Sequence, residues 1–272
     1  MTQAQWLENR FAMKITLIGA GNLATHLGKA LVAAGHGIEQ VFSQNLLRAH
    51  TLREALEANA ATNSLQEINQ NADLYIVAVP DAAIGPVVET LAECGLGNKL
   101  IVHTSGATST ETFKLASALI LRYGVFYPLQ TFTKNREIDF WDLPIFVEAN
   151  NREDLALLLN LANELSSEVF HLEDEERAKL HLAAVFVNNF VNHLFALGER
   201  IVEDAGLPFE ILRPLIQETV NKLADGTPEM MQTGPAIRRD TVTIERHLSL
   251  LAGHPALQQL YGQLTKSIQN EL

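Results

Sequence analysis

Short apolar runs alternate with helix-like segments through the first 172 residues of the chain. Each run is rich in Val, Ile, Leu or Phe and ends in glycine, proline or polar residues, as buried strands do. We predict strands at residues 14–18, 38–43, 74–79, 100–103, 121–126, 144–147 and 168–172. Helices are predicted between some of them, at residues 23–31, 82–91 and 152–165. This alternation predicts an α/β fold with a doubly wound parallel sheet and helices on both faces.

The rest of the chain has a purely helical pattern. Acidic residues at 173–176 supply the negative first turn of a long helix that we expect to reach about Ala205. Shorter helices follow at residues 208–224, 241–251 and 255–268. We therefore divide the chain into an N-terminal extension (1–12), an α/β domain (13–172) and an all-helical domain (173–272).

The turn after the first strand has the pattern of a dinucleotide-binding loop. Gly19 allows a sharp turn, Gly21 lets the backbone approach a pyrophosphate, and the small Ala24 lets the next helix pack closely. The amides of Asn22 and Leu23 begin that helix, where its dipole favours a phosphate. The alternative is a glycine-rich turn in another kind of α/β protein. The strand before the motif and the helix after it favour the nucleotide.

The end of the second strand bears on the choice of cofactor. An enzyme that binds NAD places a carboxylate there for the ribose hydroxyls. This chain has Ser43 and Asn45 instead, followed by Arg48. Hydroxyl, amide and guanidinium groups hold a 2′-phosphate that a carboxylate would repel. We therefore expect NADP, with the alternative that Arg48 is a solvated helix residue.

Further candidate residues follow the other strands, because ligands of such sheets bind outside the carboxyl ends of the strands. For the cofactor these are Val79, Pro80 and Asp81. For the substrate they are His103, Thr104, Gly106, Tyr127 and Gln130. Ser105, between two of them, is a candidate catalytic hydroxyl. All are expected around one crevice.

The long helix carries a stripe of neutral polar residues. His181, Asn188 and Asn192 lie on one side at 100° per residue, with Asn189 at the edge. Such a stripe serves either buried hydrogen bonding between helices or subunits, or a polar edge that faces the cofactor. In the second case His181 is a proton donor, and Asn188 or Asn189 orients the substrate.

A turn at residues 233–240 interrupts the helical region. It contains Gly234 and Pro235, and then two guanidinium groups. Arg238 is a candidate for an anionic group of the substrate. The alternative is a structural pair of Arg238 with Asp240 at a helix start.

The composition excludes several other functions. A net charge of −12 argues against binding nucleic acid or an anionic membrane surface. The longest stretch without charges, residues 180–198, carries too many polar residues for hydrocarbon, and we expect a buried helix of a soluble protein. Cys94 is the single cysteine, which suits a reducing cytoplasm. No metal-ligand spacing is present, and we expect no metal site.

Taken together, these motifs resemble a known family. They are Gly19–Ala24, Val77–Asp81, His103–Gly106, Pro128–Phe132, His181–Ala184 with Asn189, and Thr233–Pro235 with Arg238 and Asp240. The chain resembles predicted NADP-binding oxidoreductases with a Rossmann-like N-terminal domain and a helical C-terminal domain of unassigned function. More distantly it is similar to pyrroline-5-carboxylate reductase, deazaflavin-dependent NADP oxidoreductase, and the 6-phosphogluconate and β-hydroxyacid dehydrogenases.

The resemblance implies a 6-phosphogluconate-dehydrogenase-like helical domain, NADP binding and a homodimer formed through that domain. Two positions depart from the related patterns. The catalytic Lys and Asn of β-hydroxyacid dehydrogenases, four residues apart, have no counterpart, because Ala183 follows Lys179 at that spacing. The family usually has histidine where this chain has Tyr127, which weakens a role of that position in proton transfer.

The sequence therefore predicts a cytoplasmic, NADP-dependent oxidoreductase that transfers hydride between the nicotinamide and a small polar substrate. The alternative is an NADP-binding protein without turnover, which senses redox state or acts through a partner.

Overall fold

The structure is a computed structural model that describes residues 12–134 and 136–271. The predicted N-terminal extension lies outside the described residues except for Ala12. The chain divides into two compact units, one ending at Asn192 and the other beginning at His193. This division falls inside the long helix, whereas the sequence pattern placed the boundary before that helix.

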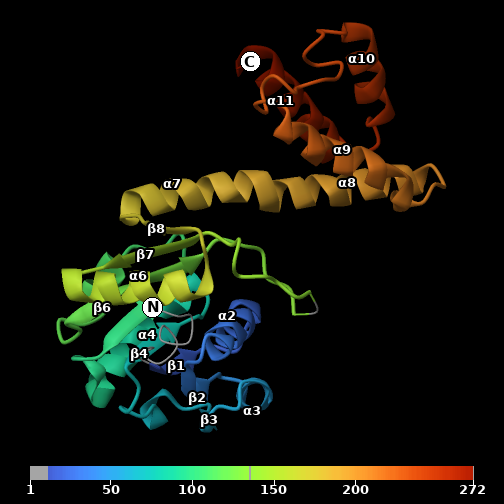
Figure 1. Ribbon diagram of the computed structural model, residues 1–272. Helices are drawn as coiled ribbons and strands as arrows, with labels where there is room; N and C mark the ends of the chain where they lie inside the picture. Colours follow the sequence, from blue (N-terminus) through green and yellow to red (C-terminus); the bar gives the residue numbers. More distant parts are fainter. Residues whose placement is uncertain (1–11, 135, 272) are drawn as a thin grey trace, which may run out of the picture. The chain divides into compact units, whose positions relative to one another are not determined.

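The first unit is built on a sheet that has eight strands within the described residues, in the order β3-β2-β1-β4-β5-β6-β7-β8 (Figure 1). The strands are β1 (Lys14–Ile18), β2 (Gly37–Phe42), β3 (Ala60–Thr62), β4 (Leu74–Val77), β5 (Leu100–His103), β6 (Arg122–Pro128), β7 (Ile145–Ala149) and β8 (Val169–His171). All neighbours from β3 to β6 are parallel. The carboxyl ends of β1, β4, β5 and β6 therefore meet at one edge.

The predicted Rossmann-type sheet is confirmed, with one correction. Strand β7 pairs antiparallel with β6, and β8 is parallel to β7. The connection from β6 to β7 contains no helix, and a parallel pair would need a long crossover, usually helical. The short β3 was not predicted, because three residues of Ala and Thr carry little hydrophobic signal.

Helices cover both faces of the sheet, as predicted. They are α2 (Asn22–Ala33), α3 (Leu46–Ala55), α4 (Asp81–Leu91), α5 (Glu111–Ala116) and α6 (Arg152–Leu165). One buried cluster joins α2, α3 and α6 to the sheet, for example through Leu27, Leu52 and Leu158. A second cluster joins α4 and α5 to the sheet through Ile84 and Phe113. Each face thus has its own apolar core, which removes both faces from water.

The long helix begins with α7 (Asp174–Ala184), widens into a π-helical turn (Val185–Phe190) and continues as α8 (Val191–Asp204). The side chain of Glu173 caps α7, and Glu176 returns a bond to the Glu173 amide. The span Asp174–Asp204 is long and apolar enough to cross a membrane by length and composition alone, with a mean hydropathy of 1.4. Its most apolar window is not buried by the described residues of the chain, so the burial expected for this helix is not found within one copy of the chain.

The second unit is helical. After α8 it contains α9 (Arg213–Asn221), α10 (Thr241–Leu250) and α11 (Pro255–Glu271), with short 3₁₀ turns on both sides of α9. The predicted helix at residues 208–224 is thus three consecutive helical pieces: 3₁₀ turns at Phe209–Leu212 and Lys222–Ala224 flank α9.

Candidate active site

The glycine-rich turn after β1 has the geometry that a dinucleotide requires. Gly19 has a φ of +132°, and a Cβ there would overlap the carbonyl of Ala78. Only glycine therefore fits at this position. Gly21 is the exposed N-cap of α2, and a Cβ added there meets no atom within 4 Å. No side chain of the described residues caps α2, so the amides of Asn22 and Leu23 stay available to an anion.

The turn between β2 and α3 is ordered by its own polar side chains. The Asn45 amide donates to Ser43 Oγ at 3.3 Å, and Asn45 Oδ1 accepts from the Arg48 amide at 3.1 Å. Asn45 is therefore the N-cap of α3. The Arg48 side chain is exposed and lines a cavity of about 300 Å³ together with Ala20 and residues of α2 and α3. Both interpretations of Arg48 stay open.

The turn after β4 lies beside the glycine-rich turn, because Ala78 is the residue that Gly19 approaches. Val79 is half-buried, Pro80 is the N-cap of α4, and Asp81 is its exposed first residue. The three residues predicted to contact the cofactor are thus at the same sheet edge as Gly19.

The last residue of β5 is a buried histidine. His103 is fully buried, stacks on Phe113 at 5.5 Å between ring centroids, and accepts the Ser105 amide at Nδ1 at 3.2 Å. Burial and the nearby Arg177 charge lower the pKa of His103 to about 3, so the ring is neutral. His103 thus shapes the turn that follows it, and its contact with a substrate stays a prediction.

The same turn holds Ser105 and Gly106 close to the sheet edge. Thr104, Ser105 and Gly106 are buried, and Ser105 Oγ accepts the amides of Ala107 and Thr108 at 3.1 and 2.9 Å. The Ser105 hydroxyl is therefore held as an acceptor, and its own proton is left as a donor.

Tyr127 and His181 form a hydrogen-bonded pair against Gly106. Tyr127 Oη lies 3.0 Å from His181 Nδ1. A Cβ on Gly106 would lie 2.6 Å from Tyr127 Cζ and 2.7 Å from His181 Nδ1. Burial, aided by the charge of Asp81, raises the pKa of Tyr127 to about 12, so the phenol keeps its proton. A phenol that donates to Nδ1 leaves the imidazole proton on Nε2.

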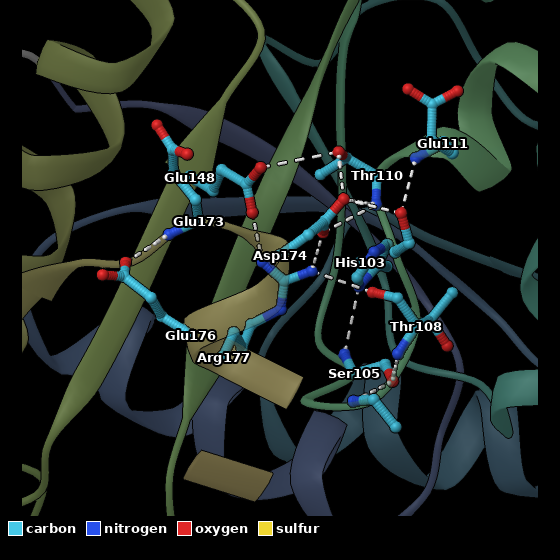
Figure 2. A network of polar contacts seen from close by, with 12 residues as sticks. His103, Ser105, Thr108, Thr110, Glu111, Glu148, Glu173, Asp174, Glu176 and Arg177 are labelled. Atoms are coloured by element: carbon cyan, nitrogen blue, oxygen red, sulfur yellow. Dashed lines mark hydrogen bonds and ion pairs between the residues drawn. The ribbon is translucent and has the colours of Figure 1, made fainter. Parts of the chain in front are cut away.

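A buried network joins the start of α7 to the turn after β5 (Figure 2). Asp174 accepts from Ser109 Oγ at 2.6 Å and from the amide of Thr110 at 2.9 Å. Arg177, with 1% of its side chain exposed, pairs with Glu148 and Asp174 and donates to the Thr108 carbonyl at 2.9 Å. This network fixes the helix that carries His181.

The two carboxyl groups that pair with Arg177 have pKa values shifted in opposite directions. Burial would raise the pKa of Asp174, but hydrogen bonds from Ser109, Thr110 and Arg177 outweigh burial and lower it to about 2. For Glu148 burial outweighs the attraction of Arg177, and its pKa is raised. The network was not predicted from the sequence. Asp174 is part of the acidic run at 173–176, and this run was explained by its favourable interaction with the helix dipole.

The asparagines of the long helix line a polar cavity of about 650 Å³. Asn188, Asn189 and Asn192 form one side, and the segment between β6 and β7 forms the other. That segment contributes Gln130, Thr131, Thr133, Arg136, Glu137, Ile138 and Asp139. His181 is not among the lining residues. A π-helical turn at 185–190 contains Asn188 and Asn189 and separates His181 from Asn192, so the spacing of 100° per residue does not hold through this part of the helix.

The segment between β6 and β7 is tied to α2. Asn22 Nδ2 donates to the Phe132 carbonyl at 2.8 Å, and His26 Nε2 lies 2.9 Å from the Thr133 carbonyl. The side chain of Asn22 is thus used in the fold, and its backbone amide is one of the first amides of α2. The polar cavity is therefore built beside the predicted cofactor site.

Arg238 belongs to the second unit and is exposed. It lies between Ala236 and the positive-φ residue Arg239. Asp240, its predicted alternative partner, caps α10 by accepting the Thr243 amide at 3.1 Å. The role of Arg238 in substrate binding stays a prediction.

Comparison with known proteins supports the same class of enzyme. Residues 14–106 match the family described as NADP oxidoreductase, coenzyme F420-dependent, and residues 143–268 match a domain of unknown function, DUF2520. The crystal structure of a protein from Bacteroides fragilis, provisionally described as an NADP oxidoreductase, is 43% identical. The similarity covers 95% of this chain and 98% of that chain, with a TM-score of 0.88.

More distant relatives share less. A reductive aminase from Aspergillus terreus, solved with NADPH and ethyl-5-oxohexanoate, is 17% identical over 95% of this chain and 94% of its own, with a TM-score of 0.67, and shows the fold alone. A glycerol-3-phosphate dehydrogenase [NAD(P)+] from Thermoanaerobacter is 26% identical over 41% of this chain. The chain spans only 37% of that curated relative.

The fold and the glycine-rich turn define a Rossmann-type dinucleotide-binding protein with a helical C-terminal region. Because the Bacteroides fragilis protein is this similar over nearly its whole length, the chain belongs to the same family of NADP oxidoreductases. The predicted family, fold, oxidoreductase class and NADP cofactor are confirmed at this level.

Proposed function

We propose that the protein transfers hydride between NADP(H) and a small polar substrate at the carboxyl edge of the sheet. The observation that carries the proposal is the juxtaposition, at one sheet edge, of the glycine-rich turn with the Tyr127–His181 pair, which Gly106 allows to form. When bound, the nicotinamide supplies or accepts the hydride.

The residues present fit the cofactor. The open N-terminus of α2 suits the pyrophosphate, because its first amides have no cap among the described side chains. Ser43, Asn45 and Arg48 offer neutral and positive groups to a 2′-phosphate. Val79, Pro80 and Asp81 line the same edge next to Gly19.

His181 is proposed as the group that donates a proton to the substrate heteroatom. When the ring is protonated on both nitrogens, Nδ1–H donates to Tyr127 Oη and the Nε2 proton passes to the substrate heteroatom, which leaves His181 as the neutral imidazole. The hydroxyl proton of Ser105 is available to the substrate oxygen or nitrogen, since Oγ is already fixed by two amides. Thr104 and Gly106 shape this end of the site.

The asparagine-lined cavity is proposed to hold the rest of the substrate. Asn188, Asn189 and Gln130 present amide donors and acceptors to it. Such a lining forms hydrogen bonds with the hydroxyl, carbonyl or amino groups of a substrate. An apolar substrate would leave these polar groups unpaired and would bind weakly. We therefore propose a small polar carbonyl or imine compound and its reduced form.

Cofactor preference gives a direct test of the binding half of this proposal. NADPH is expected to bind more tightly than NADH, and Arg48→Ala is expected to reduce the difference by about tenfold, the value of one charge-assisted hydrogen bond. Isothermal titration calorimetry measures both dissociation constants. Equal constants for the two dinucleotides in wild type and variant would contradict it.

We also propose a homodimer. Large apolar side chains are exposed along the helices of both units: Leu182, Phe186, Val187, Phe190, Ile201, Ile211, Leu215 and Val220. Monomers rarely expose apolar patches above a few hundred Å². Asn188 and Asn189 lie on the same helix and would be costly in lipid, so we propose that a second copy of the chain covers the apolar side chains.

The folds of the relatives and the single Cys94 suit a soluble cytoplasmic protein.

Light scattering at micromolar concentration tests the assembly. The expected mass is twice the 30.0 kDa of the chain. Phe186→Asp together with Val187→Asp is expected to shift the mass to that of a monomer, while the exposed change Leu119→Asp on the sheet unit leaves a dimer. A monomeric wild type would contradict the proposal.

A further inference from the structure

We propose that Lys134 is a second cation for the 2′-phosphate of NADP, acting with Arg48 in the cavity that both side chains line. The inference rests on the proposed function and names a residue of its specificity. Arg48 on α3 and Lys134 on the segment between β6 and β7 both line the cavity of about 300 Å³. Ala20, which follows Gly19 in the glycine-rich turn, lines it as well.

The lining of this cavity is suited to an anion. Besides the two cations it consists of Ala20, Thr25, Leu47, Thr51, Leu52 and Ala55. No acidic side chain is among these residues, although the chain as a whole carries a net charge of −12. No ion pair joins Arg48 or Lys134 to an acidic residue in the described part of the chain. Both charges are therefore available to a ligand.

Lys134 is carried to this position by two anchors. The carbonyls of Phe132 and Thr133 are bound by Asn22 and His26 of α2, at 2.8 and 2.9 Å. His26 is buried, and its ring centroid lies 5.6 Å from that of Phe132. The backbone is thus fixed at the residue before Lys134. Because its backbone is already fixed, Lys134 loses less conformational entropy when it binds a ligand than a lysine on a free loop would lose.

The charge of the ligand group calls for two cations. A phosphate monoester carries about −1.5 to −2 at pH 7, so one guanidinium leaves it partly uncompensated in a strongly acidic protein. Asn45 and Ser43 already spend acceptor atoms on the turn and contribute no charge. Lys134 supplies the missing positive charge. Since NADH lacks this phosphate, Lys134 contributes to the preference between the two dinucleotides.

Calorimetric titration of the full-length protein with NADPH and with NADH tests the inference. Lys134→Met keeps the apolar stem and removes the charge. It is expected to weaken NADPH binding by about tenfold and to leave NADH within about twofold, since only the phosphate contact is lost. Lys29→Met is the matched control. Lys29 shares with Lys134 the neighbouring cavity of about 770 Å³ but does not line the cavity of Arg48, so its affinities should not change.

Other outcomes overturn the inference in distinguishable ways. Unchanged NADPH affinity in Lys134→Met, with wild type still preferring NADPH, rejects Lys134 and leaves the proposed function intact. If Lys134→Met weakens the binding of NADPH and NADH equally, Lys134 contacts a part of the cofactor that both dinucleotides share. This outcome also rejects its role at the 2′-phosphate. A wild type that prefers neither dinucleotide overturns this inference and the NADP specificity together. A thermal melt of each variant without ligand shows that its fold is kept.

Discussion

Replacing His181 with glutamine is expected to lower the rate of NADPH-dependent reduction by about 10²–10⁴-fold, the usual contribution of a positioned general acid. Glutamine keeps a hydrogen-bonding group near Tyr127 but cannot deliver a proton. The loss is expected in kcat and kcat/KM, with an unchanged dissociation constant for NADPH. Steady-state kinetics and calorimetry on the same preparation measure the two effects.

Two further variants make the His181 result specific. His171→Gln changes an exposed histidine of β8 in the same unit and should leave the rate unchanged. Tyr127→Phe removes the hydroxyl that lies 3.0 Å from His181 Nδ1, and should shift the pH profile of kcat more than it changes cofactor binding. Full turnover in His181→Gln would assign His181 to the scaffold, and the proton would have to come from elsewhere.

Arg177→Met is expected to destabilise the first unit by about 3–5 kcal/mol, because it leaves Glu148 and Asp174 without their shared buried cation. Urea unfolding followed by circular dichroism measures the loss. Lys179→Met is the matched control on the same helix, since among the described residues Lys179 pairs only with Glu175 and its side chain is 74% exposed. Exposed pairs of this kind contribute about 0–1 kcal/mol.

The Arg177 variant also tests how His181 is positioned. Arg177 joins α7 to the Thr108 carbonyl, two residues beyond Gly106. If the network holds the helix in place, Arg177→Met should have a lower kcat than wild type even under conditions in which the variant is folded. Its affinity for NADPH should be unchanged. A loss of stability no larger than that of Lys179→Met would show that the buried charges are solvated by other means.

Local patterns were enough to predict much of the fold. The apolar run before Gly19 and the helix after it set the first β-strand and α2 within a residue or two. The steric need for glycine at position 19 comes from the chain itself, because the turn must pass Ala78 with a positive φ. The strand and the helix depend on neighbouring residues, which the sequence displays directly, whereas the contact of Gly19 with Ala78 joins positions 59 residues apart and appears only in the structure.

Features that depend on tertiary contacts were missed or misjudged. The burial of His103 appears only in the folded chain, where its ring stacks on Phe113 of α5. The π-helical turn at 185–190 has no signature in hydrophobic periodicity, and it departs from the 100° per residue on which the predicted stripe was based. Tyr127, predicted as a substrate contact, is also the hydrogen-bond partner of His181, which was not predicted. Contacts across 54 residues of sequence cannot be found by spacing alone.

Consumption of NADPH in the presence of a panel of keto acids, aldehydes and imines tests the central claim most directly. The wild-type protein is expected to oxidise NADPH with at least one polar member of the panel, well above a protein-free blank, and His181→Gln is expected to return the rate towards that blank. A protein that binds NADPH tightly but consumes none with any member would contradict the oxidoreductase account, and would favour an NADP-binding protein without turnover.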